Sequence, residues 1–151
     1  YFFVLIFFSL LNFQEVYAEL LKPNSELKPF DIVKIQLSAL KNNNEPHRNA
    51  GIEQTWEFAH PSNKRLTGPL PRFIQLLNDK NYSILLNHVE HKIIEIFKSE
   101  KKFIYEIIIL DEKKFYFKYT WQIEKFLNGG PLNNCWLTTA VSLPRSLGSS
   151  I

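Results

Sequence analysis

The hydrophobic period of this chain changes once, near residue 81, and this change restricts the fold more than any other feature. Before it, apolar residues recur every three or four positions, which is typical of amphipathic helices. After it, they recur every second position, which is typical of half-buried strands. Helices followed by strands, without alternation of the two, indicate an α+β fold with an antiparallel sheet.

Three helices are predicted in the first half. The first spans Pro29–Lys41, where Pro29 suits the opening turn. The second begins after Asn49 as its N-cap and ends at Pro61, and the third begins near Pro69. Their apolar stripes are Phe30, Val33, Leu37 and Leu40 in the first, Ile52, Trp56 and Ala59 in the second, and Leu70, Phe73 and Leu77 in the third.

About five strands follow, expected at residues 82–89, 91–97, 103–110, 115–123 and 135–143. Residues 115–123 show the clearest alternation. It predicts that Phe115, Phe117, Tyr119 and Trp121 face the helices on the concave side of a curved sheet. Lys118, Gln122 and Glu124 then lie on the opposite face.

The N-terminus is read as a targeting segment. Residues 1–13 are almost wholly apolar, which is short for a membrane span but fits the core of a signal peptide whose basic start is missing. Val16-Tyr17-Ala18 suits cleavage after Ala18. We therefore expect a signal peptide at 1–18, a linker at 19–28, one domain at 29–143 and a flexible tail at 144–151. The protein would be exported; the alternative is a membrane-anchored protein, held only by an uncleaved N-terminal segment.

A resemblance covers nearly the whole predicted domain. It rests on Gly51-Ile52, Trp56-Glu57-Phe58-Ala59, Pro61-Ser62-Asn63, Thr67-Gly68-Pro69, Arg72-Phe73, Tyr82 and Leu85-Leu86-Asn87-His88. It also takes in Val33, Gln36, Leu37, Ala39 and Leu40 upstream, and Cys135-Trp136-Leu137-Thr138 downstream. This pattern resembles a nuclear transport factor 2-like family known only as domain of unknown function 4864. The resemblance implies a cystatin-like cone, in which a curved sheet wraps around helices, and it implies no reaction.

The charge distribution bears on nucleic-acid binding, and the cysteine content bears on thiol chemistry. The net charge of +3 is small, and Lys98, Lys101 and Lys102 fall in one predicted turn, as Lys113 and Lys114 do in the next. No basic motif interleaved with aromatics occurs, so we expect no nucleic-acid binding. The single cysteine, Cys135, is expected to be a buried thiol beside Trp136.

No metal site or cofactor is expected. His88 and His91 are three residues apart, and on a strand they would face opposite sides. The run Gly129-Gly130-Pro131 lacks the helix and lysine that follow a phosphate-binding loop.

Two sets of site residues are candidates. Glu106, in the most apolar strand, and Tyr119, on the next, are the catalytic hypothesis, because burial raises the pKa of a carboxyl group and makes it a useful acid or base. Otherwise Glu106 points outward and Tyr119 belongs to the core. Five large aromatics could line a ligand cavity or simply fill the core: Trp56, Tyr82, Tyr119, Trp121 and Trp136.

Three functions remain open on the sequence. The leading interpretation is a non-catalytic exported cone-fold protein that binds a small apolar ligand or a protein partner in an aromatic-lined cavity. The second is a small lyase, isomerase or hydrolase with a buried acid in the cone. The third is a structural module that self-associates, as a homodimer through the sheet.

Overall fold

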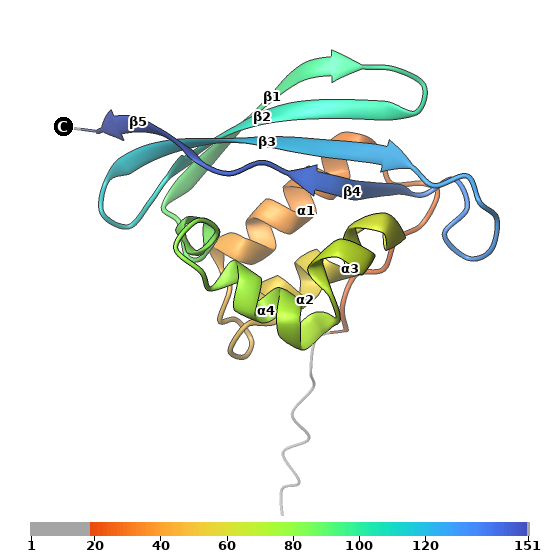
Figure 1. Cartoon of the computed structure of the whole chain (residues 1–151), viewed down its shortest axis with the longest axis horizontal. Coiled ribbons are helices and arrows are strands. Elements are labelled where there is room, and N and C mark those ends of the chain that lie inside the picture. The colour runs from red at the N-terminus through yellow and green to blue at the C-terminus, as the bar shows by residue number, and fades with distance from the viewer. Residues whose placement is uncertain (1–18, 151) are drawn as a thin grey trace, which may run out of the picture.

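The computed structural model describes residues 19–150, so the signal peptide expected at 1–18 lies outside the described residues. The helices are α1 (Pro29–Lys41), α2 (Ala50–Glu57), α3 (Pro61–Thr67) and α4 (Leu70–Leu77), followed by a short 3-10 helix at Ser83–Leu85. The strands are β1 (Glu90–Lys98), β2 (Lys102–Leu110), β3 (Phe115–Lys125), β4 (Trp136–Val141) and β5 (Arg145–Ser149). In Figure 1 the helices lie on one face of an open sheet. This confirms the α+β class. None of the helices described is long and apolar enough to cross a membrane.

The sheet is antiparallel and is organised around β3. Strands β1, β2 and β3 follow one another as a meander. The other edge of β3 is shared: β4 pairs with Trp121–Lys125, and β5 pairs with Phe115–Lys118. The chain after Trp136 therefore follows β3 along its length, and Pro144, which has no N–H to donate, lies at the break between the two strands.

The flexible tail expected at 144–151 is a wrong prediction for most of its length, because Arg145–Ser149 is strand β5. All five residues of β5 are exposed, so no buried apolar side chain indicates a strand there. Its pairing satisfies backbone groups along the N-terminal half of β3, which would otherwise form an open edge.

The first predicted strand, at 82–89, is also wrong. The carboxylate Oδ1 of Asp79 accepts hydrogen bonds from the backbone N–H groups of Asn81 and Tyr82, and the chain turns into the 3-10 helix. Asn87 then adopts a positive φ of 56°, and the sheet begins only at Glu90. Local side-chain bonds to the backbone thus override the strand-like pattern.

A fourth helix, α3, replaces the loop expected after Pro61. Proline at the first position of a helix loses no hydrogen bond, and here Pro61 opens α3. The second helix, expected to end at Pro61, ends earlier, at Glu57. His60 is the N-cap, since its Nδ1 accepts a hydrogen bond from the backbone N–H of Ser62 at 3.0 Å. Asn49 is the N-cap of α2 as predicted, although its side chain makes no capping bond.

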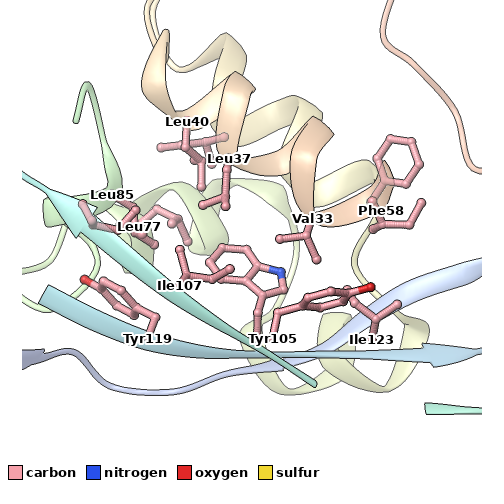
Figure 2. Close-up of a cluster of buried hydrophobic side chains, with 14 of the residues drawn as sticks. Val33, Leu37, Leu40, Phe58, Leu77, Leu85, Tyr105, Ile107, Tyr119 and Ile123 are labelled. Carbon is pink, nitrogen blue, oxygen red and sulfur yellow. The ribbon is translucent and has the colours of Figure 1, made fainter. Parts of the chain in front are cut away.

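The core lies between α1 and the sheet. Figure 2 shows Val33, Leu37 and Leu40 of α1 pointing toward Tyr105, Ile107, Tyr119 and Ile123 of the strands. Tyr119, Trp121 and Ile123 are buried on this face, which confirms the alternation predicted for β3. Phe117 is partly buried against the same core, whereas Phe115, expected on this face, is 44% exposed at the strand end. Cys135 is a buried free thiol, as predicted.

Candidate functional site

A cavity of about 70 Å³ opens where β4 passes over α3 and α4. It is lined by side chains from every helix and from two strands. The lining residues are Gln36, Thr55, Ala59, Asn63, Thr67, Phe73, Leu76, Leu77, Tyr82, Leu85, Trp121, Thr138 and Val141. Its volume is about half of the roughly 150 Å³ that admits benzene in an engineered apolar cavity. The site therefore fits a group smaller than a benzene ring, or a few water molecules.

The inner end of the cavity carries a buried polar network centred on Gln36. Gln36 Oε1 accepts hydrogen bonds from Trp121 Nε1 at 2.9 Å and from Thr138 Oγ1 at 2.6 Å. Gln36 Nε2 donates to the carbonyl oxygen of Thr55 at 3.0 Å. These residues are almost fully buried, and their mutual bonds offset the loss of hydration that burial imposes. We call Gln36, Thr55, Trp121 and Thr138 the polar floor.

The walls of the cavity are mainly apolar, and Asn63 and Thr67 of α3 are the polar exceptions. Phe73 and Leu77 come from α4, and Leu85 comes from the 3-10 helix. No Asp, Glu, Lys, Arg or His contributes to the lining. Tyr82 is the lining residue that can ionise, and burial raises the pKa of its phenol. Its hydroxyl donates to the carbonyl oxygen of Val141 at 3.1 Å. The cavity is therefore electrically neutral.

The connection between α2 and α3 holds the cavity against β4. Thr138 N–H donates to the carbonyl of Phe58 at 2.9 Å, and His60 N–H donates to the carbonyl of Thr138 at 2.8 Å. These bonds form a short parallel bridge at Ala59 that occupies part of the free edge of β4. Because the bridge fixes Thr138, its hydroxyl points at Gln36 of α1, which lies 102 residues earlier in the chain.

Two of the five predicted ligand-binding aromatics, Tyr82 and Trp121, line this cavity. The other three lie elsewhere. Tyr119 is buried in the core, and its hydroxyl donates to the carbonyl of Asn81 at 2.6 Å. Trp56 lies beneath Lys64, whose Nζ is 3.8 Å from the ring centroid, and Trp136 packs edge-on against Phe103.

The structure does not bring the two catalytic candidates together. Glu106 pairs in register with Thr120, and its carboxylate lies 3.4 Å from Lys118 Nζ on the face of the sheet that the described helices leave open. Tyr119 faces the helices, and burial raises the pKa of its phenol. The hypothesis of a Glu106–Tyr119 pair in a cone is therefore wrong.

The prediction that His88 and His91 face opposite sides is also wrong, because His88 precedes β1 and does not follow strand alternation. His88 Nδ1 lies 2.7 Å from the carbonyl of Leu85, and His88 Nε2 lies 2.7 Å from His91 Nδ1. A carbonyl can only accept, so Nδ1 of His88 carries the proton, and neutral His88 accepts from His91. Among residues 19–150 no group of three or more His, Cys, Asp or Glu side chains is placed to hold a metal ion.

Three residues of the polar floor were not predicted as site residues: Gln36, Thr55 and Thr138. Gln36 had a readable signal: it lies on the buried stripe of α1 beside Val33 and Leu37, where a polar residue needs a buried partner. Its partners on α2 and β4 carry no comparable signal, because only the tertiary fold brings them to it.

Comparisons with known proteins add no relative: the chain matches no family model, no curated protein and no solved structure.

Proposed function

We propose that this protein is a binding protein that holds a small, neutral, largely apolar group in the cavity between β4, α3 and α4. The observation that supports this function is a cavity with mainly apolar walls, a hydrogen-bonded polar floor and no charged side chain in its lining. Pockets of this composition suit ligands that bury an apolar body and use few polar contacts for orientation.

We also propose a family and a location for this protein. We assign the chain to the nuclear transport factor 2-like proteins with a cone-like sheet, supported by the order of helices followed by an antiparallel sheet. We also propose that it is exported, which is supported by the apolar run at residues 1–13 and the small-residue site ending at Ala18.

The polar floor sets the ligand chemistry. Gln36 Oε1 already accepts two hydrogen bonds, so it has little capacity left to receive a ligand's donor. Gln36 Nε2 carries two hydrogens, of which the Thr55 carbonyl takes one. The second is available for a ligand oxygen, as is one amide hydrogen of Asn63, whose Nδ2 also donates to the Thr138 carbonyl. An alcohol or amide oxygen fits this position. A carboxylate or ammonium group would lose its hydration without a compensating charge.

An NMR titration tests this chemistry with four probes of similar size: propan-1-ol, propionamide, propionate and propylammonium. We expect the two neutral probes to shift the indole N–H signal of Trp121, which Trp121→Phe identifies by removing it. The charged probes should leave this signal unchanged at equal concentration. Shifts caused equally by all four probes, or confined to Trp56 and Trp136, would contradict the proposal.

A matched pair of variants locates the binding. Leu76→Phe places a larger side chain in the lining and should abolish the Trp121 shift, because the cavity has little spare volume. Gln75→Phe adds an aromatic ring at the neighbouring exposed position of α4, outside the lining, and should leave the shift intact. Equal binding by both variants would place the probes elsewhere.

Self-association through the sheet is a second candidate. The face turned away from the described helices carries Ile94, Ile104 and Ile108 in addition to the Glu106–Lys118 ion pair. Two copies that met through this face would bury the isoleucines. Sedimentation velocity should then show a dimer that Ile108→Lys dissociates and that Gln75→Lys, on α4, leaves intact. A wild-type monomer at high micromolar concentration would rule this candidate out.

A further inference from the structure

The end of the sheet formed by the β1–β2 hairpin carries apolar and basic side chains together. Ile96 is 54% exposed and Phe97 is 47% exposed, both at a bulge near the end of β1. The bulge adds one residue to β1 and breaks the strict alternation, so neither side chain is drawn into the core. Lys98 ends β1, Lys101 lies in the hairpin turn and Lys102 begins β2.

The loop between β3 and β4 extends this surface. Lys125, the last residue of β3, donates its N–H to the carbonyl of Lys101 at 3.0 Å, which places the start of this loop beside the hairpin turn. Leu127, two residues further on, is 47% exposed. Figure 1 shows the hairpin turn and this loop at the same end of the sheet, where the loop extends furthest beyond the helices. We call Ile96, Phe97, Lys98, Lys101, Lys102, Lys125 and Leu127 the tip patch.

The two ends of the sheet differ in net charge. Glu95, Glu100 and Glu124, the last of which lies 3.7 Å from Lys102, oppose the four lysines of the tip patch, so one positive charge remains in excess. At the opposite end, the β2–β3 turn reads Asp111-Glu112-Lys113-Lys114 and has no net charge. Phe115 there is 44% exposed, so an exposed aromatic alone does not distinguish the two ends.

We propose that the tip patch docks on the surface of an anionic lipid membrane. Stable attachment of a protein to a membrane surface needs two signals, and this patch supplies both: lysines that attract anionic headgroups, and apolar side chains that enter the headgroup layer. Nucleic acid would use the lysines but not Ile96 or Leu127. This surface is separate from the cavity, and the proposal does not depend on the ligand proposed for it.

A local probe is needed, because the apolar residues 1–13 of the full chain can associate with any lipid. Glu100→Cys and Glu112→Cys each remove one glutamate from an exposed hairpin turn, at opposite ends of the sheet. Cys135 is buried, so acrylodan labels the new cysteine. With vesicles of 70% phosphatidylcholine and 30% phosphatidylserine, we expect a blue shift of emission from the label at position 100 and none at position 112. Pure phosphatidylcholine vesicles should shift neither.

Paired variants in the Glu100→Cys background separate the two signals. Each lysine is worth about fivefold in binding to an anionic surface, so Lys98→Glu with Lys101→Glu should raise the lipid concentration at half-maximal shift by roughly 25-fold or more. The matched control, Lys113→Glu with Lys114→Glu, changes net charge equally and should have little effect. Ile96→Ser with Phe97→Ser should weaken binding at least tenfold, whereas Phe115→Ser should not.

Three outcomes would overturn the proposal. One is the absence of a shift at position 100 with phosphatidylserine vesicles. Another is an equal shift at positions 100 and 112. The third is a strong effect of the lysine changes with no effect of Ile96→Ser and Phe97→Ser, together with equal binding of a short single-stranded RNA, because this would identify a basic surface for an acidic macromolecule. Circular dichroism of each variant confirms that it is folded.

Discussion

Gln36 is the residue on which the buried hydrogen bonds of the cavity converge. Gln36→Leu keeps a side chain of similar size but removes the acceptor for Trp121 Nε1 and the donor to the Thr55 carbonyl. A buried polar group left without its partner costs about 1–3 kcal/mol. We therefore expect the free energy of unfolding, measured in urea, to fall by about 2–3 kcal/mol. Gln75→Leu, at an exposed position on α4, should change it by less than about 0.5 kcal/mol.

A double variant tests whether the stability loss comes from the hydrogen-bond network of Gln36. Thr138→Val removes the hydroxyl that donates to Gln36. If the network acts as a unit, Gln36→Leu combined with Thr138→Val should lose less stability than the two single changes added together. Strict additivity, or a Gln36→Leu protein as stable as the wild type, would show that the network contributes little.

His88 makes the stability depend on pH. Desolvation lowers its pKa to about 4, the hydrogen bond to the Leu85 carbonyl opposes this shift, and the neighbouring His91 and Lys41 add to it. The unfolded chain, with a pKa near 6.5, therefore takes up a proton first as the pH falls. The contribution of His88 is complete above about pH 6.5 and is lost progressively toward pH 4, by about 3 kcal/mol.

Urea unfolding between pH 8 and pH 4 measures this effect. Carboxylates also titrate in this range, so the informative quantity is the difference between the wild type and His88→Gln, whose amide can still donate to the Leu85 carbonyl. We expect the variant to lose markedly less stability between pH 6.5 and pH 4. The same pH dependence in both proteins would mean that His88 is not buried in its neutral form.

At the scale of elements, the close crossing of α1 and α2 depends on Gly51. A Cβ added to Gly51 would overlap the carbonyl oxygen of Ala39 and lie 2.8 Å from Cα of Asn43, and both neighbours are backbone. Glycine to alanine within a helix normally stabilises by about 1 kcal/mol. Here the clash reverses the sign, and we expect Gly51→Ala to destabilise by about 3 kcal/mol.

Thermal unfolding of Gly51→Ala tests this crossing. Gly129→Ala is the control, because a Cβ there meets no atom within 4 Å and only its positive φ opposes the change. The control should lose about 1 kcal/mol. A Gly51→Ala protein more stable than the wild type would show that α1 and α2 are further apart than described.

The elements with strong periodicity were predictable, and those defined by backbone pairing were not. The bounds of α1 match the prediction, and those of β2 and β3 match within one or two residues. These elements pack against the core, so their apolar residues recur with the period of a helix or a strand. Strand β5 has no buried side chain, and the turn at Asp79 depends on bonds from a side chain to the backbone. Neither feature produces a hydrophobic period.

The same distinction applies to the candidate site. Tyr82 and Trp121 were predictable as large aromatics with a polar group, but an aromatic side chain indicates burial without saying whether it borders a cavity or fills the core. Trp136 and Tyr119 have the same character and lie elsewhere. The floor joins α1, α2, β3 and β4, and the pairing of Thr138 with Gln36 depends on the bridge at Ala59, which no local pattern encodes.

At the scale of the whole molecule, the helices and the open sheet meet around a neutral cavity with a polar floor, and the proposed binding requires that a small molecule can enter this cavity. Crystals pressurised with xenon measure this most directly, because xenon occupies small apolar cavities without needing a specific ligand. We expect a xenon peak between Phe73, Leu77 and Leu85, close to Trp121, that Leu76→Phe removes. A cavity filled by its own side chains, with xenon absent there or bound only elsewhere, would contradict the account.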